Sequence, residues 1–204
     1  MTKTLPPRFP DRLRLPLDFE PDRLAADMVR IAAGGWIAHF VTQNYDGEWS
    51  VIPLRGPAGE THPVRMIYPD PTCTEFADTS LLADAPYLRA VLGAFACPLQ
   101  AVRLMRLAPG SAIKEHSDHE LSFEEGTVRI HIPVVTNDAV DFRLNGERCV
   151  MPAGSSWYLR LSDPHSVANR GATERVHMVI DATVNGWVEA LFARGRSGRC
   201  VDPA

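Results

Sequence analysis

A histidine and a carboxylate stand two residues apart in the segment His116-Ser117-Asp118. On an extended strand, residues two apart point to the same side, so this imidazole and this carboxylate can converge on one point. A second imidazole, His165, follows downstream. Two histidines and one carboxylate form the facial ligand set of non-haem Fe(II) oxygenases, which leaves the other metal positions open. The three residues are therefore candidate metal ligands, although a lone His-x-Asp pair also arises often by chance.

Arg175 gives a second chemical cue. The turn residues Arg170-Gly171 lie midway between His165 and Arg175, so an antiparallel hairpin centred there would make these two residues cross-strand neighbours. A guanidinium beside a metal ligand in an apolar barrel needs an anion to balance it. A dicarboxylate keto acid fits, because one end can chelate the metal and the other can meet the arginine fork. The alternative is a surface arginine near a strand end.

Other polar residues are weaker candidates. Arg129 and His131 alternate with apolar residues, so their shared face is either solvated or directed into the lumen of a barrel. Tyr45 and Trp49 are candidates for substrate contact, and His39 could reach the pocket from an N-terminal hairpin. The alternative is that the aromatic rings pack in the core and that His39 is an ordinary polar histidine. The acidic segment 119–126 is either a mobile lid over the site or a solvated loop.

The composition limits the class of protein. Of the 204 residues, 45% are apolar and 23% are charged, which is typical of one soluble globular domain. A net charge of −4 disfavours nucleic acid and anionic membrane as partners. No apolar run approaches the roughly 20 residues that span a bilayer, and residues 1–22 lack the apolar region of a signal peptide. Widely spaced cysteines predict free thiols in a reducing cytoplasm; they are Cys73, Cys97, Cys149 and Cys200.

Two helices are predicted in the N-terminal half. The first spans 21–33, where an apolar stripe begins after a proline and Gly34-Gly35 end the helix. The second spans 84–96, with Asp84 as its N-cap and Pro98 beyond its end. Both helices are amphipathic, so we expect them to pack on a sheet.

β-Structure is predicted in two places. Asp46-Gly47 predicts the turn of a hairpin between 36–41 and 49–55. From residue 99 onward, short apolar runs recur at the spacing that is typical of a sandwich or a barrel. The predicted strands are 99–107, 112–116, 127–135, 139–144, 147–151, 155–161, 165–169 and 174–181, followed by a short helix at 186–194. No repeat or linker divides the chain, so a single domain is expected: 1–98 supports a core at 99–183, and 184–204 is a helix and tail.

In their order and spacing, these pieces resemble the aspartyl/asparaginyl β-hydroxylase family of Fe(II)- and 2-oxoglutarate-dependent oxygenases. The resemblance covers about residues 100–183, and the element 45–49 is similar to that of small bacterial members, which include free-proline hydroxylases. It implies a double-stranded β-helix, that is, a jelly-roll or cupin-like barrel flanked by N-terminal helices and a short C-terminal helix. The matching segments are 107–110, 116–118, 129–131, 152–154, 165–169 and 175–181.

The resemblance also implies roles for individual residues. It implies iron ligation by His116 and His165, with the distal carboxylate of 2-oxoglutarate on Arg175. It places Arg129 and His131 around the cosubstrate and substrate pocket.

The chain departs from the animal members of the family at two positions. Those that hydroxylate protein domains lack a carboxylate ligand, whereas this chain offers Asp118. Met105 stands where they have a hydroxyl that helps to hold 2-oxoglutarate. The first departure makes the chain more similar to the small bacterial branch.

The expected activity is therefore O₂-dependent hydroxylation of an unactivated C–H bond, with succinate and CO₂ as coproducts. An amino acid, a peptide or a small metabolite is the expected substrate, because the membrane anchor and helical-repeat domain of the animal enzymes are absent from the sequence. Two other classes stay open. A non-redox barrel metalloenzyme, such as an isomerase or lyase, would bind a divalent metal without needing 2-oxoglutarate. A non-catalytic binding barrel would keep its ligand affinity with His116 replaced by alanine.

Overall fold

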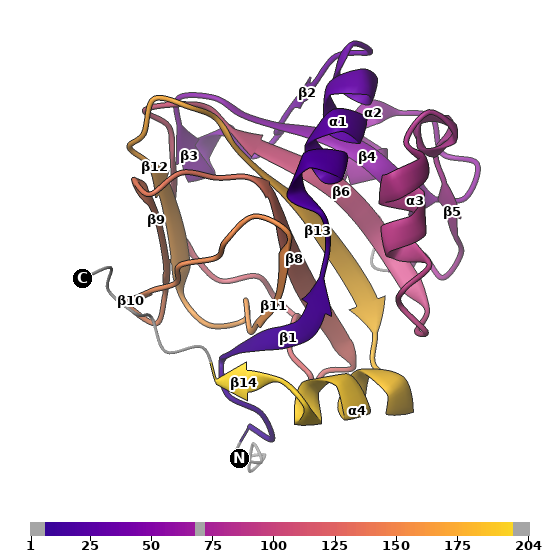
Figure 1. Cartoon of the computed structure of the whole chain (residues 1–204), viewed down its shortest axis with the longest axis vertical. Helices are drawn as coiled ribbons and strands as arrows, with labels where there is room; N and C mark the ends of the chain where they lie inside the picture. The colour runs from indigo at the N-terminus through magenta and orange to yellow at the C-terminus, as the bar shows by residue number, and fades with distance from the viewer. Residues whose placement is uncertain (1–6, 68–71, 198–204) are drawn as a thin grey trace.

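The computed structural model describes residues 7–67 and 72–197, and within them two antiparallel sheets build the molecule (Figure 1). The larger sheet has the strand order β14-β1-β11-β8-β13-β6-β4-β2, with β5 paired to β4. Its strands are β14 (Arg196–Ser197), β1 (Arg12–Asp18), β11 (Ser155–Leu159), β8 (Thr127–Val135), β13 (Arg175–Thr183), β6 (Leu99–Leu107), β4 (Trp49–Pro57), β2 (Ile37–Ala38) and β5 (Phe76–Asp78).

The smaller sheet has the order β10-β9-β12-β7-β3. Its strands are β10 (Glu147–Arg148), β9 (Val140–Leu144), β12 (His165–Asn169), β7 (Ala112–His116) and β3 (Tyr45–Asp46). Four helices and two short 3₁₀ turns complete the described residues: α1 (Pro21–Ala32), α2 (Pro63–Ile67), α3 (Pro86–Leu92), α4 (Gly186–Ala193), Thr42–Asn44 and Ser80–Ala83.

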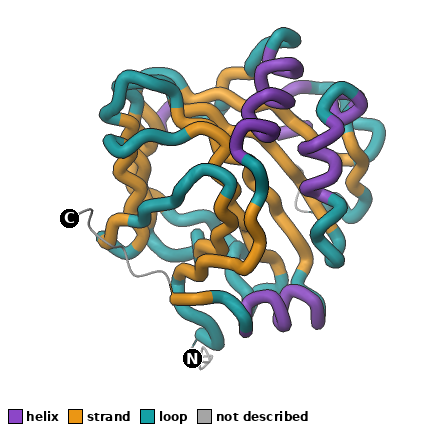
Figure 2. The backbone as a smooth tube through the Cα atoms, viewed as in Figure 1, coloured by secondary structure: helices purple, strands orange, loops and turns teal. Residues whose placement is uncertain are grey.

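The apolar side chains form two cores, one on each face of the larger sheet. One core joins that sheet to α1, α3 and α4, and it includes Leu24, Leu88 and Leu191. The other lies between the two sheets and includes Phe142 and Val179. Figure 2 shows the helices α1 and α3 gathered on one side of the strands. This is the mainly β jelly-roll arrangement that the sequence predicts, and the predicted fold class is confirmed.

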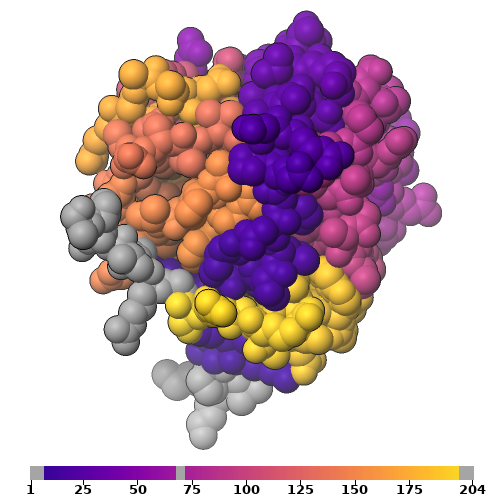
Figure 3. Space-filling view, in the orientation of Figure 1, coloured from indigo at the N-terminus to yellow at the C-terminus, as the bar shows by residue number. Residues whose placement is uncertain are grey.

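The sequence patterns did not predict the N-terminal strand β1, because prolines and charged residues interrupt the segment 7–22. Leu13, Leu15 and Leu17 alternate with other residues there, and this period of two was the available signal. The strand pairs with both β11 and β14. The space-filling view shows the N-terminal β1 region beside the C-terminal α4–β14 segment (Figure 3).

The predicted strands 36–41 and 49–55 do pair, as β2 with β4, but Asp46-Gly47 is not a tight turn between them. β3 leaves the larger sheet and pairs with β7 in the smaller one, while β2 pairs with β4. Gly47 has φ +87°, and a Cβ atom there would lie 2.3 Å from the Ser111 Oγ, so the turn needs glycine. The turn therefore carries the chain between the two sheets.

The second predicted helix is shorter than expected. It begins at Pro86 rather than at residue 84, and it ends at Leu92. Asp84 ends the preceding 3₁₀ turn and does not cap the helix. The cap comes from the neighbouring helix α1, where Asp27 accepts hydrogen bonds from the backbone N–H groups of Tyr87 and Leu88 at 2.6 and 3.1 Å.

Replacing Asp27 by alanine is expected to lower the free energy of unfolding by about 1–3 kcal/mol. The Asp27 side chain is buried, and its loss leaves two N–H groups at the start of α3 without an acceptor. Chemical denaturation measures the change. Asp22→Ala, an exposed change in the first turn of the same helix, is the control and should cost much less. Equal effects of the two substitutions would contradict the capping role.

Two further sequence expectations bear on the environment of the protein. Cys73 and Cys97 are free thiols, and burial raises the pKa of Cys97 to about 11. Cys200 lies outside the described residues. Of the helices in the described ranges, none combines the length and the apolar character that crossing a membrane requires.

Candidate active site

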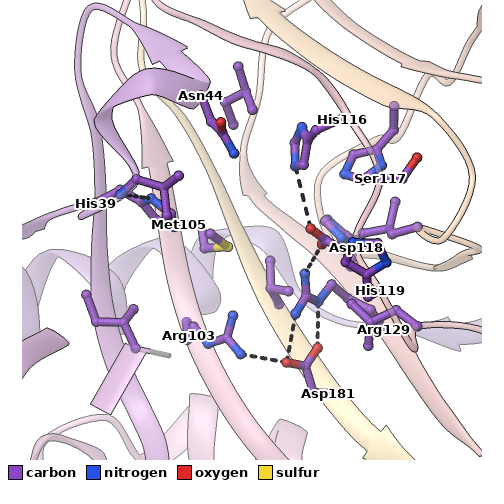
Figure 4. Close-up of a pocket in the computed structure, with 18 of the residues that line it drawn as sticks. His39, Asn44, Arg103, Met105, His116, Ser117, Asp118, His119, Arg129 and Asp181 are labelled. Atoms are coloured by element: carbon purple, nitrogen blue, oxygen red, sulfur yellow. Dashed lines mark hydrogen bonds and ion pairs between the residues drawn. The ribbon is translucent and has the colours of Figure 1, made fainter. Parts of the chain in front are cut away.

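A cavity of about 700 Å³ is lined by residues from both sheets and from the loop that follows β7 (Figure 4). Its lining includes eight of the nine residues that the sequence singled out for a site: His39, Trp49, His116, Asp118, Arg129, His131, His165 and Arg175. Tyr45 is not part of the lining. Its ring packs edge-on against Trp49 and its hydroxyl donates to the His39 carbonyl at 3.1 Å, so it supports the wall from behind.

The candidate metal ligands meet at one end of this cavity. His116 and His165 are cross-strand neighbours on β7 and β12, and Asp118 follows two residues after His116. One ligand atom from each of the three side chains lies within 4.8 Å of the others. The strand β7 ends at His116, so Asp118 is held in the loop by its backbone N–H, which donates to the Leu161 carbonyl at 2.8 Å.

Backbone carbonyls orient both imidazoles. The Nδ1 atom of His116 lies 2.8 Å from the Lys114 carbonyl oxygen. That of His165 lies 3.0 Å from the Asp163 carbonyl oxygen. A carbonyl can only accept, so each Nδ1 carries the proton and each Nε2 keeps its lone pair for a metal.

The electrostatics suit a metal as well. Burial lowers the pKa of His165, which keeps the ring in the neutral form that a metal ligand needs. Two imidazole nitrogens and one carboxylate oxygen on one side of a site fit Fe(II) with open positions.

Arg175 lines the same cavity. The residue is 3% exposed, and burial lowers its pKa to about 9. Its Nη2 lies 2.8 Å from the His177 Nδ1 atom, while its Nε is buried without a hydrogen-bond partner. Throughout the residues that the structure describes, no carboxylate lies within 4.0 Å of this guanidinium. A buried, unbalanced cation at a cavity wall fits the distal carboxylate of 2-oxoglutarate.

The predicted hairpin between His165 and Arg175 is wrong. β12 pairs with β7 and β9 in the smaller sheet, whereas β13 pairs with β6 and β8 in the larger one. The segment 170–174 is a crossing between sheets. Both residues nevertheless line one cavity, His165 from the smaller sheet and Arg175 from the larger one.

His131 and His177 form a neutral pair beside Arg175. Burial and the nearby guanidinium lower the pKa of both imidazoles well below the usual range. His177 Nδ1 accepts from Arg175, so the His131 Nδ1 that lies 3.3 Å from it must be the donor. His131 Nε2 is then an acceptor at the cavity, with no partner among the described residues.

Arg129 lines the cavity and also contacts two carboxylates. Its Nε and Nη2 donate to the two oxygens of Asp181 at 2.6 and 2.9 Å, and its Nη1 donates to Asp118 Oδ2 at 2.5 Å. Arg103 Nη2 donates to the same Asp181 at 2.6 Å. Burial opposes the charge of Arg129, but Asp181 and Asp118 together raise its pKa.

Sequence reasoning missed Asp181 and Arg103, although signals for both were present. Residues 175, 177, 179 and 181 share one face of a strand, so Asp181 follows from the same alternation that pairs Arg175 with His177. Arg103 is a charged residue with apolar neighbours on both sides, and a charge in such a place needs a partner.

The wall nearest the N-terminal segment is aromatic. The rings of His39 and Trp49 stack with centroids 3.5 Å apart and planes 6° apart. Trp49 Nε1 is buried and makes no hydrogen bond within the described ranges. The wall therefore offers a flat apolar surface with one free N–H donor.

His39 gives a prediction about pH and stability. Burial, with the Arg103 charge, lowers the pKa of His39 to about 4. Between the ordinary value of 6.5 and about 4, the unfolded chain binds a proton that the folded chain does not, so stability should fall as the pH falls through this window. His39→Asn should flatten this slope in denaturation experiments at pH 4–7. An unchanged slope would contradict a neutral, half-buried His39.

The loop 117–126 forms the remaining wall. His119, Glu120 and Glu125 line the cavity, and Leu121 is buried against it. Glu120 has a left-handed φ of +60°, which is uncommon for a residue other than glycine. The loop is packed on the site in this structure, and its movement as a lid stays a prediction.

Comparison with known proteins shows which family this chain belongs to. The family model described as "Aspartyl/Asparaginyl beta-hydroxylase" matches residues 23–184. A curated relative, the L-proline cis-4-hydroxylase of Rhizobium meliloti (strain 1021), is 26% identical over 180 residues. That alignment covers 85% of this chain and 61% of the relative, so the chain spans less than two thirds of the relative's length.

Two solved structures share the fold. The Pseudomonas putida prolyl-4-hydroxylase matches with a TM-score of 0.50 and 14% identity, covering 86% of this chain and 94% of that one. The viral collagen prolyl hydroxylase of Paramecium Bursaria Chlorella virus-1 matches with a TM-score of 0.50 and 9% identity, covering 85% and 97%. At these identities the likeness concerns the fold alone. Because this family model matches most of its length, the chain belongs to the aspartyl/asparaginyl β-hydroxylase family.

Proposed function

We propose that this protein is an Fe(II)- and 2-oxoglutarate-dependent dioxygenase that hydroxylates an unactivated C–H bond of an amino acid or a similarly small metabolite. One observation carries the proposal: a His-Asp-His ligand set and a buried arginine without a carboxylate partner line the same cavity. A non-redox metalloenzyme has no need of the second feature, and a simple binding barrel has no need of the first. Free thiols and the acidic net charge support a cytoplasmic enzyme without a nucleic-acid partner.

The residues divide the work between them. When bound, Fe(II) and 2-oxoglutarate supply the activation of O₂ and the oxidising power, with succinate and CO₂ as coproducts. His116, Asp118 and His165 would hold the metal on one side. Arg175 would hold the distal carboxylate of 2-oxoglutarate, which fixes the direction in which its keto-acid end points. Buried apolar side chains around the site, such as Leu121, keep water away from the reacting groups.

The substrate would occupy the part of the cavity between the metal ligands and the aromatic wall. A cavity of about 700 Å³ accommodates a cosubstrate and a small molecule but not a folded protein. His39 and Trp49 would contact the apolar part of the substrate, and Trp49 Nε1 would donate to one of its acceptor groups. Proline is the first candidate to test, because the curated relative is a proline hydroxylase. Peptides with an accessible end are the second class.

The test is a turnover screen. Protein loaded with Fe(II) is supplied with 2-oxoglutarate, O₂ and ascorbate, and the twenty amino acids and short peptides are added one at a time. The proposal predicts that one class of substrate raises succinate formation well above the uncoupled rate, with one hydroxylated product per succinate. The proposal would be contradicted if no member of the panel raised succinate formation and a substrate reacted without 2-oxoglutarate.

A further inference from the structure

A chain of alternating charges runs across the larger sheet toward the metal ligands (Figure 4). Arg103 on β6 bonds Asp181 on β13, Asp181 bonds Arg129 on β8, and Arg129 bonds Asp118 in the loop. Arg129 and Asp181 are direct cross-strand partners in the β8–β13 ladder. Side chains from three adjacent strands of the sheet are therefore linked to one carboxylate in the loop.

The middle of this chain is buried and fully bonded at its carboxylate. Arg103 is 7% exposed and Asp181 is 6% exposed. Arg129 takes both oxygens of Asp181 with its Nε and Nη2 atoms, and this two-point contact fixes the plane of its guanidinium. Only Nη1 is left to point at Asp118, so its direction is set by Asp181.

The far end of the chain lies outside the sheet. Asp118 lies beyond the end of β7, and 29% of its side chain is exposed. Its backbone is tethered to Leu161, but this tether does not fix the rotation of the carboxylate. The bond from Arg129 engages Oδ2 and leaves Oδ1 facing His116 Nε2 at 3.6 Å. Arg129 therefore selects which oxygen of Asp118 is offered to the metal.

We propose that Asp181 is a positioning residue, which holds Arg129 so that Asp118 presents a single oxygen beside His116 and His165. The inference rests on the proposed function, since it concerns a metal at these three residues. Asparagine at position 181 would keep one acceptor but turn an NH₂ group toward an Arg129 N–H. It would also leave two buried guanidinium groups without a shared anion. Arg129 would then be free to rotate and to bind Asp118 in place of the metal.

The experiment measures metal affinity rather than turnover. Co(II) replaces Fe(II) as the probe, and its visible absorption is followed during titration of the wild type and of Asp181→Asn. The affinity for Co(II) should fall about 10- to 100-fold in the variant, which is the usual cost of losing a partner that orients a metal ligand. The intensity and shape of the Co(II) bands should also change, because the mode of carboxylate ligation changes.

A matched control comes from a second aspartate in an arginine cluster. Asp141 on β9 is 11% exposed in its side chain and contacts Arg143, Arg148 and Arg170, but it does not line the cavity. Asp141→Asn removes a similar carboxylate from a similar cluster. Its Co(II) affinity should equal that of the wild type, whatever happens to its thermal stability.

A double-mutant cycle separates positioning from long-range charge. If Asp181 acts through Arg129, then Asp181→Asn should have little further effect on Co(II) affinity in an Arg129→Met background. Additive effects would mean that the Asp181 charge acts on the metal directly, and they would overturn the proposal. If Asp181→Asn fails to fold, Arg129→Lys replaces it, because lysine keeps the charge but cannot hold both carboxylates. Unchanged Co(II) binding in Arg129→Lys would equally overturn the proposal.

The wild-type titration distinguishes this inference from the proposed function. A wild type that binds Co(II), with equal binding in Asp181→Asn, would overturn the role of Asp181 alone. A wild type that binds no Co(II) at His116, Asp118 and His165 would overturn the proposed function and this inference together.

Discussion

Replacing His116 by alanine is expected to abolish metal binding at the site and, with it, oxygenase turnover. The three ligand atoms lie within 4.8 Å of one another, and losing one leaves only a two-point site. The loss in metal affinity should exceed the roughly 10- to 100-fold cost of removing a partner that merely orients a ligand. The fold should survive, because His116 lies at the end of β7 and its side chain is 21% exposed. Metal content after anaerobic reconstitution and succinate formation are the measurements.

The neighbouring histidine supplies the control. His119 lies three residues further along the same loop, is exposed and lines the cavity, but it is not part of the ligand cluster. His119→Ala should keep its metal. If His119→Ala lost the metal and His116→Ala retained it, the assignment of the ligands would be wrong.

Replacing Arg175 by methionine is expected to weaken 2-oxoglutarate binding by about 10- to 150-fold, the equivalent of roughly 1.5–3 kcal/mol for a lost charge-assisted contact. Methionine keeps an unbranched stem of similar character but removes the charge and the planar fork. Metal affinity should change little, because Arg175 does not contact the ligands. Isothermal titration of the Fe(II)-free or Zn(II)-loaded protein with 2-oxoglutarate measures the loss without turnover. Arg175→Lys keeps the charge without the fork, and it should retain part of the affinity.

Although Arg175→Met should weaken 2-oxoglutarate binding, it should not lower the thermal stability of the free protein. Burial lowers the pKa of Arg175 to about 9, so the free protein carries a cation in a place that disfavours it. Without 2-oxoglutarate, Arg175→Met should therefore melt at the same temperature as the wild type or higher. With saturating 2-oxoglutarate, the wild type should gain thermal stability and the variant should not. A variant that is both less stable and still stabilised by 2-oxoglutarate would show that the guanidinium has a structural role instead.

The strands of the barrel core could be predicted from local sequence because each one is short, apolar and bounded by turn residues. The strands β6, β7, β8 and β12 begin and end at the predicted residues. The connections could not be predicted in the same way. A glycine-containing turn can close a hairpin or carry the chain to the opposite sheet, and the same residues suit both. That ambiguity explains the errors at Asp46-Gly47 and at Arg170-Gly171.

The ligands of the site were predictable, but the contacts that orient them were not. His116, Asp118, His165 and Arg175 have residue types that carry chemistry, so their spacing was informative. The bond between Asp181 and Arg129 depends on the register of β8 against β13, which no local pattern fixes. The capping of α3 by Asp27 is similar, because a distant carboxylate took the role that the sequence assigned to Asp84.

The most direct test of the central claim is the visible spectrum of the anaerobic protein with Fe(II) and 2-oxoglutarate. Chelation of the metal by the keto-acid end of 2-oxoglutarate gives a metal-to-ligand charge-transfer band, and no substrate is needed to observe it. We expect this band in the wild type, its absence in His116→Ala, and a higher 2-oxoglutarate requirement in Arg175→Met. A wild type that binds Fe(II) normally but shows no band at saturating 2-oxoglutarate would contradict the account and would favour a non-redox metalloenzyme.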